Sequence, residues 1–386
     1  MANNNKHPGP NVPALRFPEF SGEWVKSKLG NIAEFSKGTG ISKDQRSETG
    51  MPCILYGELY TRYKSEVIKN VISKTDLPDA DLVKSRSNDI IIPASGETAE
   101  DIATARCVPF DNVLLGGDLN IIRLKNQDGR FFSYQLNGVR KYDIATVAQG
   151  VSVVHLHAGD LKGIMVKYPS DIVEQRKISE MISLIDDRIE TQSKIIKDKE
   201  TLYKAISSRL FLRCSNSSAT YKLGNIANLY QPETVPSTKL SCDGSYLVYG
   251  ANGIIGRYDK FNHAESQICL TCRGNTCGNI NFSQPFSWIT GNAMVINIDS
   301  NTGNIDKRFL YHYLKNYNFT PCISGSGQPQ IIRSAVEKLP VPNVNIHTQK
   351  QIASVLDSIV TSIDVAREKV NLDQNVKKYL LDNMFI

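Results

Sequence analysis

The chain has 386 residues and a formal net charge of +6, with 41% hydrophobic and 22% charged residues. That length exceeds one ordinary core and indicates two folded domains with connectors, while the small positive balance only weakly favours a polyanionic partner. The polar opening and the lack of any long apolar run argue against a secreted or membrane protein. We therefore expect a cytoplasmic protein whose eight cysteines are free thiols.

A hexapeptide marks the start of two similar halves. Lys-Leu-Gly-Asn-Ile-Ala at residues 28–33 returns unchanged at 222–227. After each copy, short β-branched runs alternate with Gly, Asn and Asp turns, which is typical of a strand-rich α+β domain. We predict a first such domain over residues 1–170, disordered over 1–11, and a second over 214–345. A duplication of this size implies two modules related by a pseudo-twofold axis.

Three loops recur at matched positions in the two modules. The pairs are 56–63 with 249–258, 92–98 with 270–276, and 117–122 with 291–296. The second copy of the first pair is two residues longer. Recurring glycine-rich loops bring backbone amides and short polar side chains to one surface, although turn chemistry explains any single loop equally well.

Each module is followed by a long segment with a heptad pattern. Residues 175–211 align without gaps with 349–385, and no proline or glycine interrupts either stretch. The pattern predicts two long helices, over 171–213 and 346–386. Each could pack only on its own domain, but two stripes in register across the duplication favour an antiparallel coiled coil between them. The predicted seam consists of Ile178, Ile182, Ile185, Ile189, Ile196, Leu210, Ile352, Leu356, Ile359, Ile363, Val370 and Met384.

Several motifs together point to a known family. They are the opening run 12–24 with Lys-Leu-Gly after it, Tyr-Gly-Glu-Leu-Tyr-Thr at 56–61, Tyr-Gly-Ala-Asn-Gly-Ile-Ile-Gly at 249–256, Leu-Pro-Val-Pro at 339–342 with Gln349 beyond, and the closing Met384-Phe385. In combination, and over nearly the whole chain, they resemble the specificity subunits of type I restriction-modification enzymes.

The resemblance implies a division of labour. Tandem target-recognition domains would each read one half of a split, asymmetric site in double-stranded DNA, and the two helices would recruit two modification subunits. Restriction subunits would join them, with S-adenosylmethionine, ATP and Mg bound by the partner subunits. The chain itself would not be a catalyst, and it contains no Asn-Pro-Pro-Tyr-like motif, no Gly-Lys dipeptide and no Gly-x-Ser-x-Gly motif. The reader of a standalone methyltransferase without a nuclease is a close alternative.

Candidate DNA contacts follow from the chemistry of readout. Base edges are read by Arg, Lys, Asn, Gln, Ser or Thr, and phosphates by positive charge or backbone amides. In the first module we select Tyr60, Arg62, Lys64, Ser95 and Thr98, with Arg140 and Lys141 toward phosphates. In the second we select Arg257, Tyr258, Arg273, Asn275, Thr276, Gln328 and Gln330.

Two other constellations define alternatives of a different class. Cys269, Cys272 and Cys277 form a C-x2-C-x4-C run, and His155 and His157 share one face of a predicted strand. Either could hold a metal in a self-sufficient nuclease, but no fourth ligand or second spaced pair is evident, so we favour buried thiols and structural histidines and expect no metal. A protein-only scaffold for symmetric partner binding is a further alternative.

Overall fold

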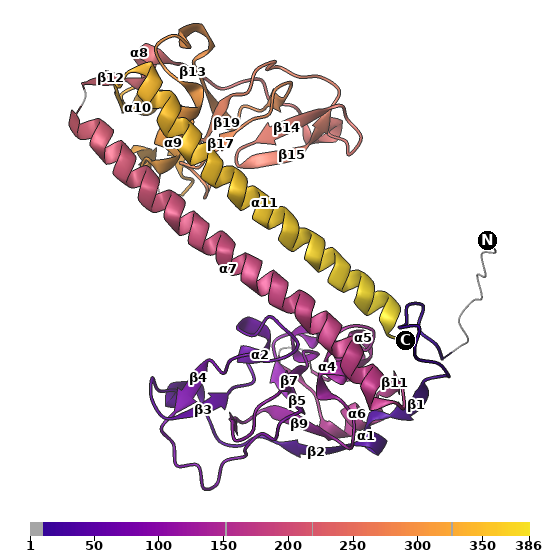
Figure 1. Cartoon of the computed structure of the whole chain (residues 1–386). Helices are drawn as coiled ribbons and strands as arrows, with labels where there is room; N and C mark the ends of the chain where they lie inside the picture. The colour runs from indigo at the N-terminus through magenta and orange to yellow at the C-terminus, as the bar shows by residue number, and fades with distance from the viewer. Residues whose placement is uncertain (1–10, 151–152, 218, 326) are drawn as a thin grey trace, which may run out of the picture. The chain divides into compact units, whose positions relative to one another are not determined.

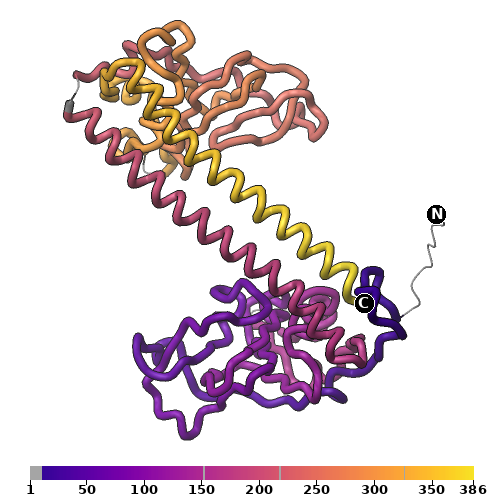
Figure 2. The backbone as a smooth tube through the Cα atoms, in the orientation of Figure 1, coloured from indigo at the N-terminus to yellow at the C-terminus, as the bar shows by residue number. Residues whose placement is uncertain are grey.

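The computed structural model describes residues 11–150, 153–217, 219–325 and 327–386, and it divides into two compact units (Figure 1). Unit 1 comprises Met1–Gln192 with Lys369–Ile386, and unit 2 comprises Ser193–Glu368. The disorder expected for residues 1–11 falls outside the described residues except at Asn11, whose carbonyl accepts a hydrogen bond from the Trp24 amide over 2.8 Å. Each unit contains one strand-rich module and one stretch of each long helix, as the backbone trace shows (Figure 2).

The module of unit 1 is built on a four-stranded antiparallel sheet. Its order is β2 (Ala33–Lys37), β9 (Leu119–Leu124), β5 (Asp89–Pro93) and β7 (Arg106–Val108). All five residues of β5 are buried, as expected for a central strand with a continuous apolar run. The smaller pairings involve β1 (Val25–Lys28) with β11 (Met165–Tyr168), β6 (Ser95–Gly96) with β10 (Val154–His155), and β3 (Met51–Ile54) between β4 (Ser73–Thr75) and β8 (Leu114–Leu115).

Short helices surround these strands. They are α1 (Leu29–Ile32), α2 (Glu58–Thr61), α3 (Ala99–Ile102), α4 (Gly129–Asn137), α5 (Lys141–Val147) and α6 (Ala158–Gly163), with a 3-10 turn η1 (Lys43–Gln45). Helix α4 carries Phe131 and Phe132, both fully buried, into the main core. Its N-terminus is capped by Asp128, whose carboxylate accepts from the Phe131 amide over 2.9 Å.

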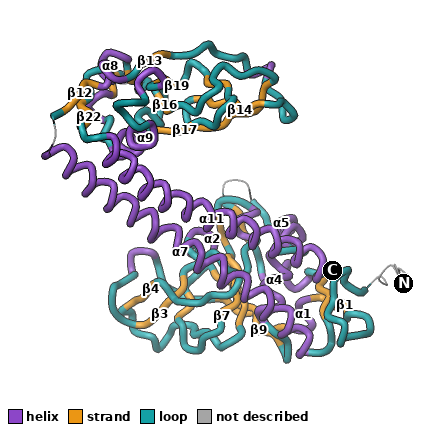
Figure 3. Tube along the Cα trace, turned by 45° about the horizontal axis from the view of Figure 1, so that its top comes forward, coloured by secondary structure: helices purple, strands orange, loops and turns teal. Residues whose placement is uncertain are grey.

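The module of unit 2 repeats this plan. Its main sheet has the order β13 (Asn228–Tyr230), β19 (Ala293–Asn297), β16 (Ile268–Thr271) and β17 (Ile280–Phe282), and a second sheet has β14 (Tyr246–Gly250) between β15 (Gly253–Tyr258) and β18 (Trp288–Ile289). The remaining elements are β12 (Thr220–Lys222), β20 (Ile323–Ser324), β21 (Gln330–Ile331), β22 (Pro340–Pro342), α8 (Leu223–Ile226), α9 (Lys307–Asn316), α10 (Arg333–Val336) and the 3-10 turns η2 (Ser237–Lys239), η3 (Asp299–Asn301) and η4 (Thr320–Cys322). Both modules therefore mix strands with short helices (Figure 3), and the predicted α+β class is confirmed.

One side-chain contact recurs in both units and explains the duplicated glutamine. In unit 1 the amide of Asp128 donates to the Gln175 side chain over 3.0 Å. In unit 2 the amide of Asp306 donates to the Gln349 side chain over 2.8 Å. Each glutamine thus joins the start of a long helix to the capped end of a module helix.

The long helices are α7 (Ile172–Ser217) and α11 (Ile346–Met384), and they pack against each other within each unit. Arg188 pairs with Asp373 over 2.9 Å in unit 1, and Glu200 pairs with Arg367 over 2.6 Å in unit 2. Later positions of α7 meet earlier positions of α11, so the helices are antiparallel. This confirms the predicted coiled coil. No helix among the described residues is both long and apolar enough to cross a bilayer.

The predicted seam also belongs to the module cores. In unit 1, Ile178, Ile182 and Ile185 share one buried cluster with Met384 and Phe131. In unit 2, buried Ile352 and Leu356 lie in the cluster of the module, with Leu210 and Ile359 packed against it. Ile363 is buried, and Ile189, Ile196 and Val370 are partly buried. Each helix therefore packs on a module and on the other helix.

Candidate nucleic-acid interface

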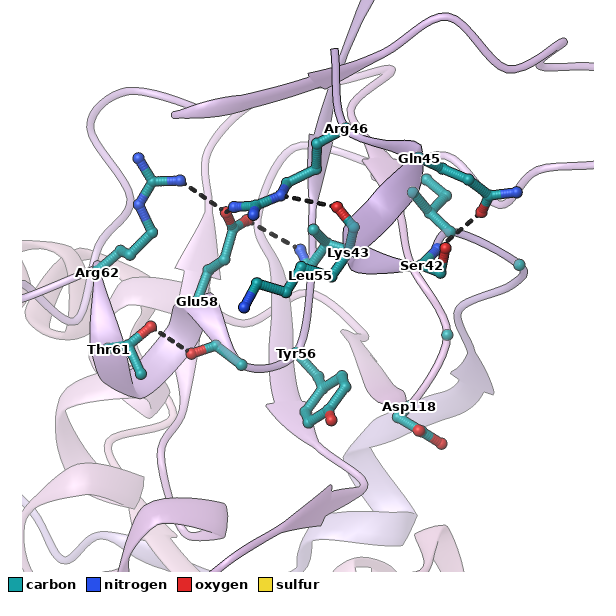
Figure 4. Close-up of a pocket in the computed structure, with 14 residues that line it drawn as sticks. Ser42, Lys43, Gln45, Arg46, Leu55, Tyr56, Glu58, Thr61, Arg62 and Asp118 are labelled. Carbon is teal, nitrogen blue, oxygen red and sulfur yellow. Dashed lines mark hydrogen bonds and ion pairs between the residues drawn. The ribbon is translucent and has the colours of Figure 1, made fainter.

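Unit 1 contains a cavity of about 850 Å³ beside α2. Tyr56 and Gly57 lead into α2 on one side, and Asp118 belongs to the matched glycine loop that follows β8. Asp118 has a φ of 56°, a backbone conformation uncommon outside glycine, and its side chain is exposed. Figure 4 shows Tyr56 and Asp118 among the residues that line the cavity. The cavity is thus lined by an aromatic ring, a carboxylate and backbone groups of glycine residues.

A buried carboxylate organises the cationic side of this cavity. Glu58 is 5% exposed and accepts from the Leu55 amide over 3.2 Å and from Arg62 over 3.0 Å. Arg46 approaches the same carboxylate to 3.8 Å, and Ser73 donates to it as well. A buried charge needs such partners, so Glu58 fixes both guanidinium groups at the rim (Figure 4).

One predicted residue of the first module lies at this rim. Arg62 lines the cavity with its side chain 42% exposed. Lys64 is exposed and Tyr60 is partly buried, but neither is among the residues that line the cavity. Burial raises the pKa of Tyr60, and the nearby Tyr56 and Asp101 raise it further.

Two other predicted residues of this module have roles within the fold. Thr98 caps α3, because its hydroxyl accepts from the Asp101 amide over 3.1 Å and donates to the Asp101 carboxylate over 2.7 Å. Ser95 is buried in β6, opposite His155 of β10. Both stay predictions as DNA contacts, but Ser95 would have to act from a largely covered position.

The geometry does not favour Arg140 as a phosphate contact. Its guanidinium pairs with Asp143 over 3.1 Å and donates to the backbone carbonyl of Ile386 over 2.8 Å. The side chain is only 19% exposed. Arg140 therefore ties the C-terminal residue to unit 1, whereas the neighbouring Lys141 is partly exposed.

At the position matching α2, unit 2 forms a β-hairpin. The shared Tyr249-Gly250 dipeptide ends β14, and the chain turns directly into β15. Arg257 is exposed and donates to the Gly244 carbonyl over 3.1 Å. Tyr258 packs edge-on against Trp288, with ring centroids 5.4 Å apart, so it is a partly buried packing residue.

The loop after the central strand is built alike in the two modules. In unit 1 the Leu156 amide donates to the Ala94 carbonyl over 2.9 Å, and in unit 2 the Ile331 amide donates to the Cys272 carbonyl over 3.0 Å. In unit 2 this pairing places Arg273 opposite Gln330. The structure therefore brings together two residues that the sequence predicted as a group.

Other predicted residues of unit 2 surround this pair. Asn275, Thr276 and Gln328 are exposed, as are Arg273 and Gln330. A cavity of about 370 Å³ is lined by Arg273 and Gln330 together with residues that sequence reasoning missed, namely Tyr230, Gln231 and Arg333. The first two follow the repeated hexapeptide, which is the signal that could have identified them. In unit 1 the missed residues are Lys43, Arg46, Tyr56 and Asp118, of which only Tyr56 and Asp118 lie in a matched loop.

The three cysteines of the C-x2-C-x4-C run contact different neighbours. Burial raises the pKa of Cys269 to about 12. The Cys272 sulfur lies 3.3 Å from the Asn292 carbonyl, and Cys277 lies 3.2 Å from the Pro329 carbonyl. Within the described ranges, no three His, Cys, Asp or Glu side chains are placed to hold a metal ion.

The paired histidines are both exposed. The rings of His155 and His157 are nearly parallel, with an interplanar angle of 11° and centroids 6.5 Å apart. They therefore belong to the surface of unit 1 next to β6, rather than to its core.

Comparison with known proteins identifies relatives of nearly the whole chain and of parts of it. The family model described as "Type I restriction modification DNA specificity domain" matches residues 21–198 and 216–372. The type I restriction enzyme MjaVIII specificity subunit of Methanocaldococcus jannaschii is 20% identical, over 95% of this chain and 92% of its own. A putative type I restriction enzyme specificity subunit of Haemophilus influenzae is 27% identical over 142 residues, which span 36% of either chain.

The fold is also similar to solved structures. The crystal structure of the type I restriction-modification system S subunit from M. genitalium matches with a TM-score of 0.71 at 18% identity, over 97% of this chain and 99% of that one. A chain from a structure on complex assembly and conformational transition of the type I R-M system matches with a TM-score of 0.52 at 14% identity. At these identities the likeness concerns the fold.

Proposed function

Because the chain belongs to the family of type I restriction-modification DNA specificity domains, we propose that it directs a modification complex to DNA by reading one half of a bipartite, asymmetric site with each module. The observation that carries this proposal is the internal duplication. Two modules share one sheet order and one glutamine contact to a long helix, yet they differ at the loops that face solvent. Two unlike half-sites can be read by two modules that share one fold and differ in the loops that contact the bases.

The first reading surface is the rim of the cavity in unit 1. Exposed Lys43 with Arg46 and Arg62 supplies positive charge, and Tyr56 and Asp118 supply polar groups beside it. Cations on a rim suit phosphates, and the polar groups between them suit base edges. We assign the first half-site to this surface.

The second reading surface is the paired loop of unit 2. Arg273 opposite Gln330 offers two long hydrogen-bonding side chains from neighbouring segments, with Asn275 and Thr276 next to them. Arginine commonly reads guanine and glutamine commonly reads adenine in the major groove. We assign the second half-site to these residues.

The long helices would dock the modification subunits. In the part of α11 that belongs to unit 1, Leu372, Val376 and Tyr379 are 62%, 40% and 58% exposed. Their spacing of four and three residues places them on one face of the helix. An exposed apolar face of this kind suits a protein partner better than solvent.

Catalysis would reside in the partners. S-adenosylmethionine would bind to the modification subunits, and ATP and Mg to the restriction subunits. This chain would contribute sequence recognition and assembly without a catalytic residue. That division is supported by the family's general character as a specificity component.

Methylation mapping tests the proposal directly. Long-read sequencing of host DNA, with and without this chain, should show one methylated motif split by a nonspecific gap that disappears when the chain is deleted. An unsplit motif, or methylation unchanged by the deletion, would contradict the proposal. Restriction of unmodified plasmid DNA in the same cells distinguishes a complex with a nuclease from a standalone methyltransferase.

A further inference from the structure

The β14–β15 hairpin of unit 2, labelled in Figure 1, has two isoleucines directly after its turn. Ile254 and Ile255 are 56% and 52% exposed. Ile254 lies opposite Tyr249, whereas Ile255 is an extra residue at a bulge in the pairing. A bulge re-aims side chains and β-branched side chains are stiff, so this tip presents a rigid apolar surface.

Two side-chain hydrogen bonds hold the tip against the neighbouring loop. The Thr271 hydroxyl donates to the Ala251 carbonyl, and the Asn279 amide donates to the Asn252 side chain over 3.1 Å. Thr271 ends β16, and Asn279 closes the loop that carries Arg273. The turn that precedes the isoleucines is therefore held against the loop that carries the second set of candidate base contacts.

The surroundings of the tip indicate what would cover it. Arg257 and Arg273 are exposed cations, and Asn275 and Thr276 are exposed hydrogen-bonding groups. DNA matches this mixture, because phosphates pair with cations, base edges pair with amides and hydroxyls, and the C5-methyl group of thymine is an apolar group displayed in the major groove. That groove also admits a two-stranded β-ribbon.

We propose that the β14–β15 hairpin enters the major groove and that Ile254 and Ile255 contact a thymine methyl group in the half-site read by unit 2. The inference rests on the proposed function and adds a hydrophobic contribution to base recognition. At the matched position unit 1 has the cavity beside α2 and no such hairpin in its described residues. Methyl recognition of this kind is therefore confined to one half-site.

The test removes the methyl group from the DNA. The complete modification complex is bound to a duplex carrying the motif found by methylation mapping, and each thymine is replaced in turn by deoxyuridine. One or two positions in a single half-site should weaken binding about fourfold, the factor for losing one buried methylene-sized group. This part needs no variant of the protein.

Matched variants then locate the contact. Ile254→Ala and Ile255→Ala should each weaken binding to thymine DNA and show a smaller further loss with deoxyuridine at those positions. Ile72→Ala is the control, because Ile72 is an exposed isoleucine of unit 1 at 43%, and it should keep the full deoxyuridine effect. Thermal melting verifies that each variant is folded.

Two results would overturn the inference. One is that no thymine in either half-site depends on its methyl group, and the other is that the full dependence survives in both isoleucine variants. A complex that binds all sequences equally would instead contradict the proposed function, so the two failures are distinguishable.

Discussion

The two modules differ most at the position that follows their shared Tyr-Gly dipeptide. In unit 1 the chain forms α2, and Glu58 of that helix anchors two arginines at the rim of a cavity. In unit 2 the chain continues into a hairpin with isoleucines at its tip. Both elements are attached to modules whose main sheets have the same strand order. The comparison teaches that a frame of buried strands tolerates a concave or a convex surface element at one attachment point.

The modules also differ where they meet the long helices. In unit 1, the hydroxyl of Tyr134 on α4 donates to Asp186 over 2.8 Å, and Lys377 pairs with the same carboxylate over 2.7 Å. In unit 2, His312 on α9 lies between the Tyr203 hydroxyl and Asp357, with 2.8 Å to each. Equivalent junctions are thus closed by different polar groups, so each can be disturbed separately.

Matched phenylalanines should produce the largest effect. In unit 1 the ring centroids of Phe385 and Phe131 are 5.0 Å apart. Phe211 is the counterpart of Phe385 in the helix alignment, and in unit 2 its ring centroid is 5.6 Å from that of Phe309. Replacing either by alanine leaves a cavity, so each variant should lose about 3–5 kcal/mol of unfolding free energy in its own unit. Hydrogen exchange should show lost protection in unit 1 for Phe385→Ala and in unit 2 for Phe211→Ala. The Leu372→Ala control, at a 62% exposed position, should change stability by less than about 0.5 kcal/mol.

If either variant loses protection equally in both units, the phenylalanine does not stabilise one unit alone, which would contradict this prediction.

The buried lysine should be the next most sensitive position. Lys377 is 15% exposed and pairs with Asp186 and, over 2.5 Å, with Glu66. Lys377→Met would leave the buried Asp186 carboxylate and the partly buried Glu66 carboxylate without their cation, and we expect a loss of about 3 kcal/mol, measured by urea unfolding. The exposed pair of Arg367 with Glu200 supplies the control, because Arg367→Met should cost less than about 1 kcal/mol. If the two variants lose the same unfolding free energy, burial does not determine how much each ion pair contributes to stability.

Arg273→Ala tests the difference between the reading surfaces. If Arg273 contacts a base, the variant should lose about 1–3 kcal/mol of discrimination at one position of one half-site. Binding of the assembled complex to a panel of single-base variants measures this loss. An equal decrease for every sequence, with a shallower salt dependence, would make Arg273 a phosphate contact instead. Arg62→Ala in unit 1 should affect only the other half-site.

The smallest expected effect is a pH dependence confined to unit 2. Burial is the main reason that the pKa of His312 is lowered, although Asp357 opposes this shift, and nearby Arg308 and Lys315 reinforce it. The unfolded chain therefore binds a proton below about pH 6.5 that folded unit 2 does not, and stability is lost as the pH falls below that value. The slope is at most about 1.4 kcal/mol per pH unit.

Asp357 contributes separately in stronger acid. Burial alone would raise its pKa, but hydrogen bonds from His312 and Arg308 hold the pKa of Asp357 at about 2. Its contribution is present above about pH 4 and lost as the pH falls toward 2. His312→Gln should flatten the profile of unit 2 between pH 7 and 5, as followed by hydrogen exchange at each pH. If the stability of unit 2 falls with the same slope in this variant, the proton binds to another group.

The duplication made the frame predictable from the sequence. Gln175 and Gln349 align across the repeat, and the structure gives them the same partner, the amide of a capping aspartate. The heptad pattern likewise predicted buried positions such as Ile182 and Leu356, both fully buried. Residues that repeat in the sequence make contacts that repeat in the structure. These repeated contacts hold the modules and the long helices together.

The proposed reading surfaces were predictable only in part. Arg273 and Gln330 were selected as a group, and the structure places them opposite each other. Arg46 was missed because it lies outside every matched loop and reaches the cavity only through the buried carboxylate of Glu58. The role of Arg140 depends on Ile386, which is 246 residues away in the chain, and no local pattern reports such a contact.

The placement of the last residues has a consequence for synthesis. Met384 and Phe385 belong to the core of the first module, and the Asn383 carbonyl accepts from the Leu15 amide over 2.9 Å. A ribosome makes these residues long after residues 1–170 have emerged. The first module therefore cannot complete its core until the end of α11 has been made. A nascent chain stalled anywhere within α11 would carry a first module without its final packing.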